Sequence, residues 1–142
     1  DHYAEIHLAA PAPFVLPTPP ALLDDPKTSL RDIAEYLMTP CYSGMFISRT
    51  VVGDLGRELQ LPRGFTDRTT MLVNLMQAAA QYDGTLPLLD KLIDHVQAAQ
   101  HFYSAHCTSA TRFAIQPWIQ RAAQTIDLLT TIKSSARDQM PS

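Results

Sequence analysis

The stretch TDRTTMLVNLMQAAAQYDGTLPLLDKLIDHV, residues 66–96, predicts two helices joined by a tight turn at Asp83-Gly84. Asp67 is placed to cap the first helix, because its carboxylate can accept hydrogen bonds from the free N–H groups of the first turn. Gly84 is expected to end that helix in a left-handed conformation, and Thr85 to cap the second helix. Each helix carries an apolar stripe that must be buried, at Met71, Leu72, Leu75, Met76 and Ala79 and at Leu88, Leu89, Leu92, Ile93 and Val96.

Apolar residues at helical spacing elsewhere predict three further helices, so the chain is expected to fold as an all-α bundle of about five helices. They are expected at residues 29–38, at residues 44–59, and after a break at 108–111 as far as about residue 136. The first of them opens with Ser29 and Asp32, which have the spacing of a capping box. It ends before Pro40, because a residue that precedes proline avoids the helical conformation.

Two glycines and a proline lie where they would weaken the predicted helices. Gly53 and Gly56 fall inside the helix at 44–59, where each costs about 1 kcal/mol relative to alanine. We interpret them as a close helix crossing or a break. A backbone approach to a ligand is the less favoured alternative, because no phosphate-binding spacing surrounds them. Either Ser43 or Ser48 can cap this helix, and Pro117 either begins or kinks the last one.

Residues 1–27 form a proline-rich N-terminal arm, with six of the eleven prolines between Pro11 and Pro26. This density excludes a regular helix and predicts an extended segment. It is either a linker or an arm that packs on this bundle or on another copy. The apolar residues available for packing are Phe14, Val15, Leu16, Leu22 and Leu23. The bundle is expected at residues 28–138, and the polar end SSARDQMPS, including a tail at 139–142, is expected to fray.

Composition narrows the classes of function. The chain has 142 residues, which suits one domain, and a net charge of −3, which gives no general attraction to nucleic acid. No apolar run approaches the roughly 18 residues of a membrane span, so no membrane partner is expected. Cys41 and Cys107 give no disulfide framework, which favours a cytoplasmic location. The chain begins with Asp1, so it is expected to be a fragment or a processed product.

The sequence contains no pattern typical of an enzyme. It lacks the nucleophile elbow Gly-x-Ser-x-Gly, a glycine-rich phosphate loop and the zinc motif His-Glu-x-x-His, so neither catalysis nor a cofactor is expected. Residues with metal-ligand chemistry occur at His95, His101, His106 and Cys107, at gaps of six, five and one. Ligands on one helix face lie three, four or seven apart, so we predict no metal site. The aromatic residues Tyr82, Phe102, Tyr103, Phe113 and Trp118 are predicted to be core rather than a binding platform.

Charges separate along the chain. Basic residues fall around the predicted helix at 44–59 and the turn after it, at Arg49, Arg57, Arg63 and Arg68. Acidic residues fall on the second helix of the hairpin and its cap, at Asp83, Asp90 and Asp94. If the two sets lie on different sides of the bundle, copies can dock head to tail. An ordinary mixed surface is the alternative. The interaction candidates are therefore Phe14, Leu16, Leu22, Arg49, Arg57, Arg63, Asp90 and Asp94.

Residues 29–96 resemble the bacterial effector-associated domains, which are small death-like helical bundles. The resemblance rests on a leucine-rich helix ending in LGRELQLP, a helix ending in LVNLMQAAAQYDG, and a third opening with GTLPLLDKL. The matching positions are Leu55, Leu59, Leu72, Leu75, Gly84, Leu86, Leu89 and Leu92. Members often carry basic residues just before the glycine, whereas this chain has Gln81, Tyr82 and Asp83. The resemblance implies homotypic binding that couples an effector to a sensor, with no catalytic residues.

The leading prediction is therefore a non-catalytic protein-interaction module, whose partner is another copy or a like helical domain. A helical subunit or regulatory domain of a larger complex is the alternative. A small-ligand or metal-binding bundle is the least favoured interpretation.

Overall fold

A computed structural model describes residues 15–139, which form six α-helices and one 3-10 helix, with no strand in this range. The elements are η1 (Leu22–Asp24), α2 (Leu30–Met38), α3 (Pro40–Ser43), α4 (Arg49–Leu59), α5 (Arg68–Gln81), α6 (Thr85–Ala105) and α7 (Arg112–Asp138). The expected all-α fold is confirmed. There is one α-helix more than the five expected, because the short helix α3 separates α2 from α4.

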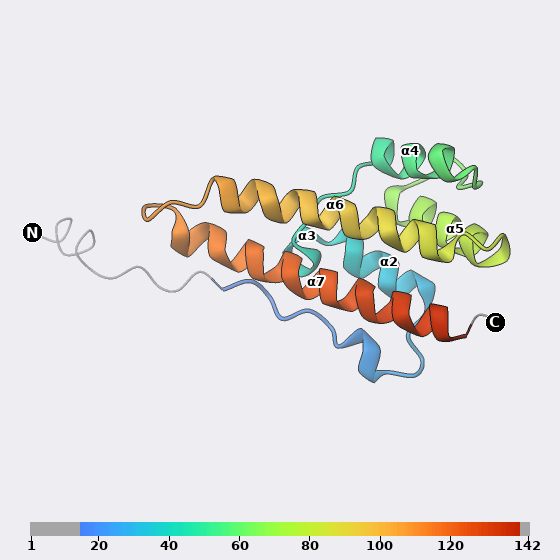
Figure 1. Ribbon diagram of the computed structural model, residues 1–142, viewed down its shortest axis with the longest axis horizontal. Coiled ribbons are helices and arrows are strands. Elements are labelled where there is room, and N and C mark those ends of the chain that lie inside the picture. Colours follow the sequence, from blue (N-terminus) through green and yellow to red (C-terminus); the bar gives the residue numbers. More distant parts are fainter. Residues whose placement is uncertain (1–14, 140–142) are drawn as a thin grey trace, which may run out of the picture.

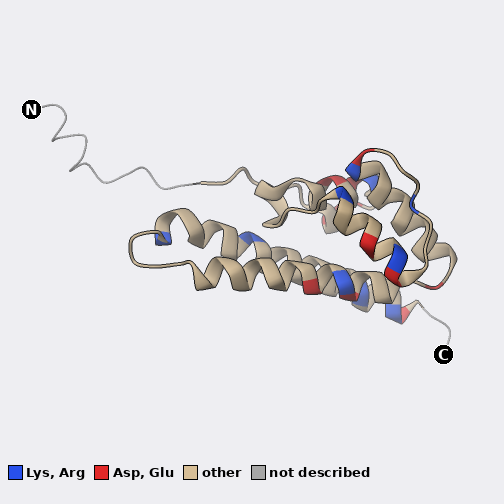
Figure 2. Ribbon diagram, turned by 90° about the horizontal axis from the view of Figure 1, so that it is seen from above, with Lys and Arg blue, Asp and Glu red and all other residues tan. Residues whose placement is uncertain are grey.

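The long antiparallel helices α6 and α7 form a hairpin that spans the molecule (Figure 1). The smaller helices α2, α4 and α5 gather over one half of this hairpin (Figures 1 and 2). The core lies between these layers and includes five leucines that are at most 1% exposed, Leu37, Leu72, Leu75, Leu92 and Leu129. The other half of the hairpin, residues 97–121, projects beyond the smaller helices and contains no buried residue.

Helix α2 begins and ends as the sequence predicts. The Ser29 hydroxyl accepts a hydrogen bond from the Asp32 N–H at 3.2 Å, and the Asp32 carboxylate accepts one from the Ser29 N–H at 2.9 Å. This reciprocal pair is the expected capping box. The helix stops at Thr39, and Pro40 then becomes the first residue of α3, where its missing N–H is not needed.

The predicted helix at 44–59 is wrong in its first five residues. Gly44 has φ 75° and ends α3, and α4 begins only at Arg49, with the Ser48 hydroxyl accepting from the Val51 N–H at 3.1 Å. Gly44 also crosses α7 closely, since a Cβ there would lie 2.5 Å from the backbone nitrogen of Ala122. The glycine that was expected to start a helix therefore ends one, for a reason that comes from tertiary packing.

The glycines inside α4 differ from each other. A Cβ at Gly56 would lie 2.4 Å from Cδ of Arg63, so the loop after α4 folds back on this position. Gly53 has no atom within 4 Å of the Cβ position. Gly56 is therefore closely approached, but by the loop after α4 and not by another helix. The close helix crossing that was expected inside α4 is found at Gly44 instead.

The turn between α5 and α6 differs from the prediction by one residue. Asp83 has the left-handed conformation, with φ 59°, whereas Gly84 has φ −98° and precedes α6 as its N-cap. The Gly84 N–H donates to the Ala79 carbonyl at 2.7 Å. This bond spans five residues of the chain and is the 6→1 hydrogen bond of a Schellman motif. Thr85 is the first residue of α6 and its side chain does not cap the helix, contrary to expectation.

We expect Asp83→Val to lower the free energy of unfolding by about 1–2 kcal/mol, because a β-branched side chain is strained at positive φ. Asp83→Gly is the matched control and should keep or raise stability. Urea unfolding followed by circular dichroism measures both. Equal midpoints for the two variants would contradict the left-handed conformation of residue 83.

The Asp67 cap of α5 is confirmed. Its carboxylate accepts a hydrogen bond from the Thr70 N–H at 3.0 Å, and this hydrogen bond holds the pKa of Asp67 below its usual value. At the other end of the chain, Pro117 lies inside α7 rather than at its start. Residues 134–138, which were expected to fray, are the last turn of α7.

The described part of the arm, residues 15–27, runs along α7 of the same chain (Figure 1). Leu16 and Leu22 are buried in this packing, at 6% and 8% exposure. The Arg121 guanidinium donates to the main-chain carbonyls of Leu16 at 3.1 Å and Pro17 at 2.8 Å. Leu16, Leu22 and the Arg121 hydrogen bonds attach this segment to the bundle, while most of its other side chains are exposed. Phe14 lies outside the described residues.

Candidate functional site

An apolar groove opens between α3, the loop after α3 and the projecting half of the α6–α7 hairpin. We call it the hairpin groove; its volume is about 540 Å³ and its lining residues are Pro40, Met45, Phe46, Phe102, Tyr103, His106, Ala114, Ile115 and Trp118. Phe46 and Phe102 are each 60% exposed. Scattered exposed apolar residues are common on proteins, whereas here several apolar side chains from three segments line one hollow.

The prediction that the aromatic residues of α6 and α7 belong to the core is therefore wrong. Phe102 and Phe113 are mostly exposed, and Tyr103 and Trp118 are half-buried. Tyr82, the C-cap residue of α5, is also exposed. These residues do have helical spacing, but α6 and α7 extend past α2, α4 and α5, and α3 with the loop after it covers this face only in part (Figure 2).

Contacts within the hairpin fix the rings that line the groove. Phe102 lies 4.3 Å from the ring of His106, centroid to centroid, and the Nδ1 of His106 is 2.9 Å from the Phe102 carbonyl. Tyr103 and Trp118 bridge α6 and α7 with centroids 6.4 Å apart. Burial raises the pKa of Tyr103 above its usual value. A groove with ordered rings loses little side-chain entropy when it binds a partner.

Charge is distributed unevenly along the hairpin. The segment 95–126 contains no aspartate or glutamate, and its charged residues are Arg112 and Arg121. Figure 2 shows the result: most charged residues surround the half of the molecule that carries α2, α4 and α5. The residues that line the hairpin groove include no lysine, arginine, aspartate or glutamate, and the Arg121 guanidinium bonds to the arm instead.

The predicted basic candidates come together on the opposite part of the molecule. Arg49, Arg57 and Arg63 line a hollow of about 780 Å³ formed by α4, the loop after it and the start of α5. The guanidinium of Arg49 lies 4.7 Å from the centroid of the Phe65 ring, a cation–π distance. Arg57 is paired with Asp54 of its own helix. We call this surface the arginine face.

The predicted acidic candidates do not form a matching surface. Asp90 is paired with Lys133 of α7, so it is used within the bundle. Asp94 is exposed one turn further along α6. Lys91, on the same helix, pairs with Glu58 of α4 at 2.8 Å. This hydrogen bond raises the pKa of Lys91 and lowers that of Glu58. These exposed pairs contribute little to stability.

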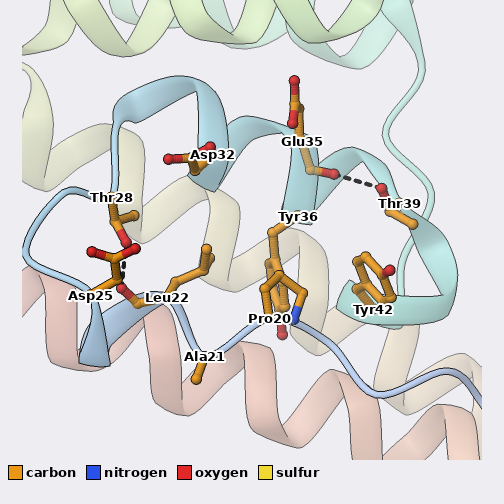
Figure 3. A pocket seen from close by; sticks show the side chains of 10 residues that line it. All are labelled: Pro20, Ala21, Leu22, Asp25, Thr28, Asp32, Glu35, Tyr36, Thr39 and Tyr42. Carbon is orange, nitrogen blue, oxygen red and sulfur yellow. Dashed lines mark hydrogen bonds between the residues drawn. The ribbon is translucent and has the colours of Figure 1, made fainter.

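Sequence reasoning missed a second acidic surface, which lies between the arm and α2. This hollow, about 430 Å³, is lined by Asp25, Asp32 and Glu35 together with Tyr36, Tyr42 and Pro20 (Figure 3). The Tyr36 and Tyr42 rings stack with centroids 6.3 Å apart. The signal in the sequence was the recurrence of acidic residues at 25, 32 and 35, but only the packing of the arm against α2 places them around one hollow. We call it the acidic hollow.

Other site chemistry is sparse in the described residues. Among residues 15–139, no three histidine, cysteine, aspartate or glutamate side chains lie close enough to hold a metal ion. His95 contacts the Phe46 carbonyl at 3.0 Å, and Cys41 and Cys107 are free thiols. No helix in the part of the chain that the structure describes is long and apolar enough to span a bilayer.

Comparison with protein-family models, with curated proteins and with solved structures finds no match for this chain. The resemblance to effector-associated domains stays a prediction.

Proposed function

We propose that this chain is a non-catalytic protein-interaction module that acts as an adaptor. The observation that supports it best is the hairpin groove, in which aromatic rings from α6 and α7 face solvent although the chain has an ordinary core elsewhere. Exposing such rings weakens a protein's solubility, so they are expected to be covered in a complex. Homotypic coupling of an effector to a sensor, as the family resemblance implies, is the adaptor role that we expect.

The chemistry of the groove favours one kind of occupant. Aromatic and aliphatic walls favour an apolar helix or extended segment that inserts side chains between Phe102 and Trp118. At the edge of the groove the Arg68 guanidinium lies 4.7 Å from the centroid of the Phe46 ring, so a segment flanked by glutamate or aspartate fits better than a basic one. We therefore propose that the groove binds an apolar, acid-flanked segment of a partner protein.

A titration with synthetic peptides tests this proposal, because Trp118 is the single tryptophan of the chain and lies in the groove. The probe is an amphipathic helical peptide with leucines on one face and glutamates beside them. We expect a saturable blue shift of the Trp118 emission as the indole leaves water. Phe102→Ser should weaken binding about tenfold or more, as loss of an aromatic anchor does.

Phe113→Ser is the matched control, since Phe113 is 57% exposed on the same hairpin but does not line the groove. It should bind the peptide as the wild type does. A second control replaces each glutamate of the peptide with lysine. Absence of saturable binding, or equal binding of the lysine peptide, would contradict the proposed docking chemistry.

A further inference from the structure

Phe65 is the most exposed of the large apolar side chains in residues 15–139, at 89%. It lies in the loop before α5, where neither neighbouring helix covers it, and Arg49 stacks on its ring at 4.7 Å. The pair forms a knob, apolar at its centre and cationic at its edge, next to Arg57 and Arg63. An exposed aromatic ring beside arginines has the composition of the residues that dominate binding at protein interfaces.

The acidic hollow has the opposite features. Its walls include the stacked rings of Tyr36 and Tyr42, and its border carries the carboxylates of Asp25, Asp32 and Glu35 (Figure 3). None of these three carboxylates forms an ion pair with a lysine or arginine side chain in the described residues, although Asp32 accepts the capping bond from the Ser29 N–H and Asp25 accepts one from the Lys27 N–H. The hollow thus carries carboxylates where the knob carries arginines, so the two surfaces are opposite in charge.

The two surfaces cannot meet within one chain. The arm and η1 lie beyond α7 and α4 lies beyond α6, at opposite edges of the hairpin (Figure 1). We propose that Phe65 and Arg49 of one copy dock in the acidic hollow of a second copy, with Arg63 facing the carboxylates of that copy. Such a contact joins two different surfaces, so it leaves one knob and one hollow unoccupied in a dimer and continues into larger assemblies.

This inference deepens the proposed function, because it gives homotypic binding a surface distinct from the hairpin groove. It also replaces the head-to-tail pairing that the sequence suggested. The arginines around α4 remain one of the two docking surfaces. The other docking surface is now the acidic hollow instead of Asp90 and Asp94.

Sedimentation velocity over a range of protein concentrations tests the assembly. The wild type should form species larger than a dimer at about 50 mM salt and dissociate at about 500 mM, since exposed charge pairs are screened. Phe65→Ser and Glu35→Arg should each weaken self-association about tenfold or more. Both residues are exposed, so circular dichroism should show unchanged folding.

Mixing the two variants gives the sharpest readout. Phe65→Ser removes the knob but keeps the hollow, and Glu35→Arg does the reverse, so the mixture should form a one-to-one dimer and nothing larger. A monomeric wild type at all concentrations, or variants that stay monomeric when mixed, would overturn the inference.

Phe102→Ser separates this inference from the proposed function. It should leave self-association intact while it weakens peptide binding in the hairpin groove. If Phe102→Ser dissociates the assembly and Phe65→Ser does not, the second copy occupies the hairpin groove and the knob proposal is wrong. Peptide binding without self-association would support the proposed function and refute the contact between copies.

Discussion

Gly44→Ala is expected to lower the free energy of unfolding by about 2–5 kcal/mol. Two effects add at this position. The backbone is left-handed, with φ 75°, which strains any residue with a Cβ by about 1–2 kcal/mol. The added methyl group would also lie 2.5 Å from the backbone nitrogen of Ala122, and a helix backbone cannot move aside as a flexible side chain can. Overpacking of this kind costs about 1–3 kcal/mol.

Gly53→Ala is the matched control for this variant. Gly53 lies inside α4 with open space at its Cβ position, so alanine there should raise stability by up to about 1 kcal/mol through helix propensity. Urea unfolding at constant pH compares the two. If Gly44→Ala unfolded at the wild-type midpoint, the close crossing of α3 and α7 would be refuted.

Thr125→Val is expected to lower the free energy of unfolding by about 2–4 kcal/mol. Thr125 is fully buried on α7, where its hydroxyl donates to the Ser43 carbonyl at 2.8 Å and lies 3.0 Å from the Tyr36 hydroxyl. Valine has almost the same shape, so the effect isolates the hydroxyl. Its loss leaves the Ser43 carbonyl and the Tyr36 hydroxyl in the interior without this partner, at about 1–3 kcal/mol for each.

A double-mutant cycle with Tyr36→Phe checks the cause. Removing the Tyr36 hydroxyl as well should cost less in the Thr125→Val background than in the wild type, because the partner is already missing. Thr130→Val, at an exposed position of the same helix, should change stability little. Additive effects of Thr125→Val and Tyr36→Phe would show that the two hydroxyls do not interact.

Local signals in the sequence were sufficient for much of the fold. Capping by Ser29 and Asp67 depends on residues within one turn, and both helices begin where the sequence places them. The apolar stripes of α5 and α6 are buried as expected at Leu72, Leu75 and Leu92. These features depend on short-range geometry, which the order of residues determines directly.

Long-range packing accounts for the failures. Gly44 ends α3 and crosses α7, yet nothing near it in the sequence reveals the α7 backbone. Phe102 and Phe113 have the spacing of a buried face, but burial requires a covering layer, and the smaller helices stop short of them. The acidic hollow needed the arm to fold against α2 before its carboxylates became one surface.

The hairpin described above also has a kinetic consequence. Helices α6 and α7 are neighbours in the chain and make the largest contact in the bundle, so bringing them together costs little loop-closure entropy. The α3–α7 crossing instead joins Ser43 to Thr125, 82 residues away. We expect the hairpin to form early in folding and this crossing late. Defects at the crossing should then act mainly on the unfolding limb of a chevron plot, which makes the crossing a determinant of the native state's lifetime.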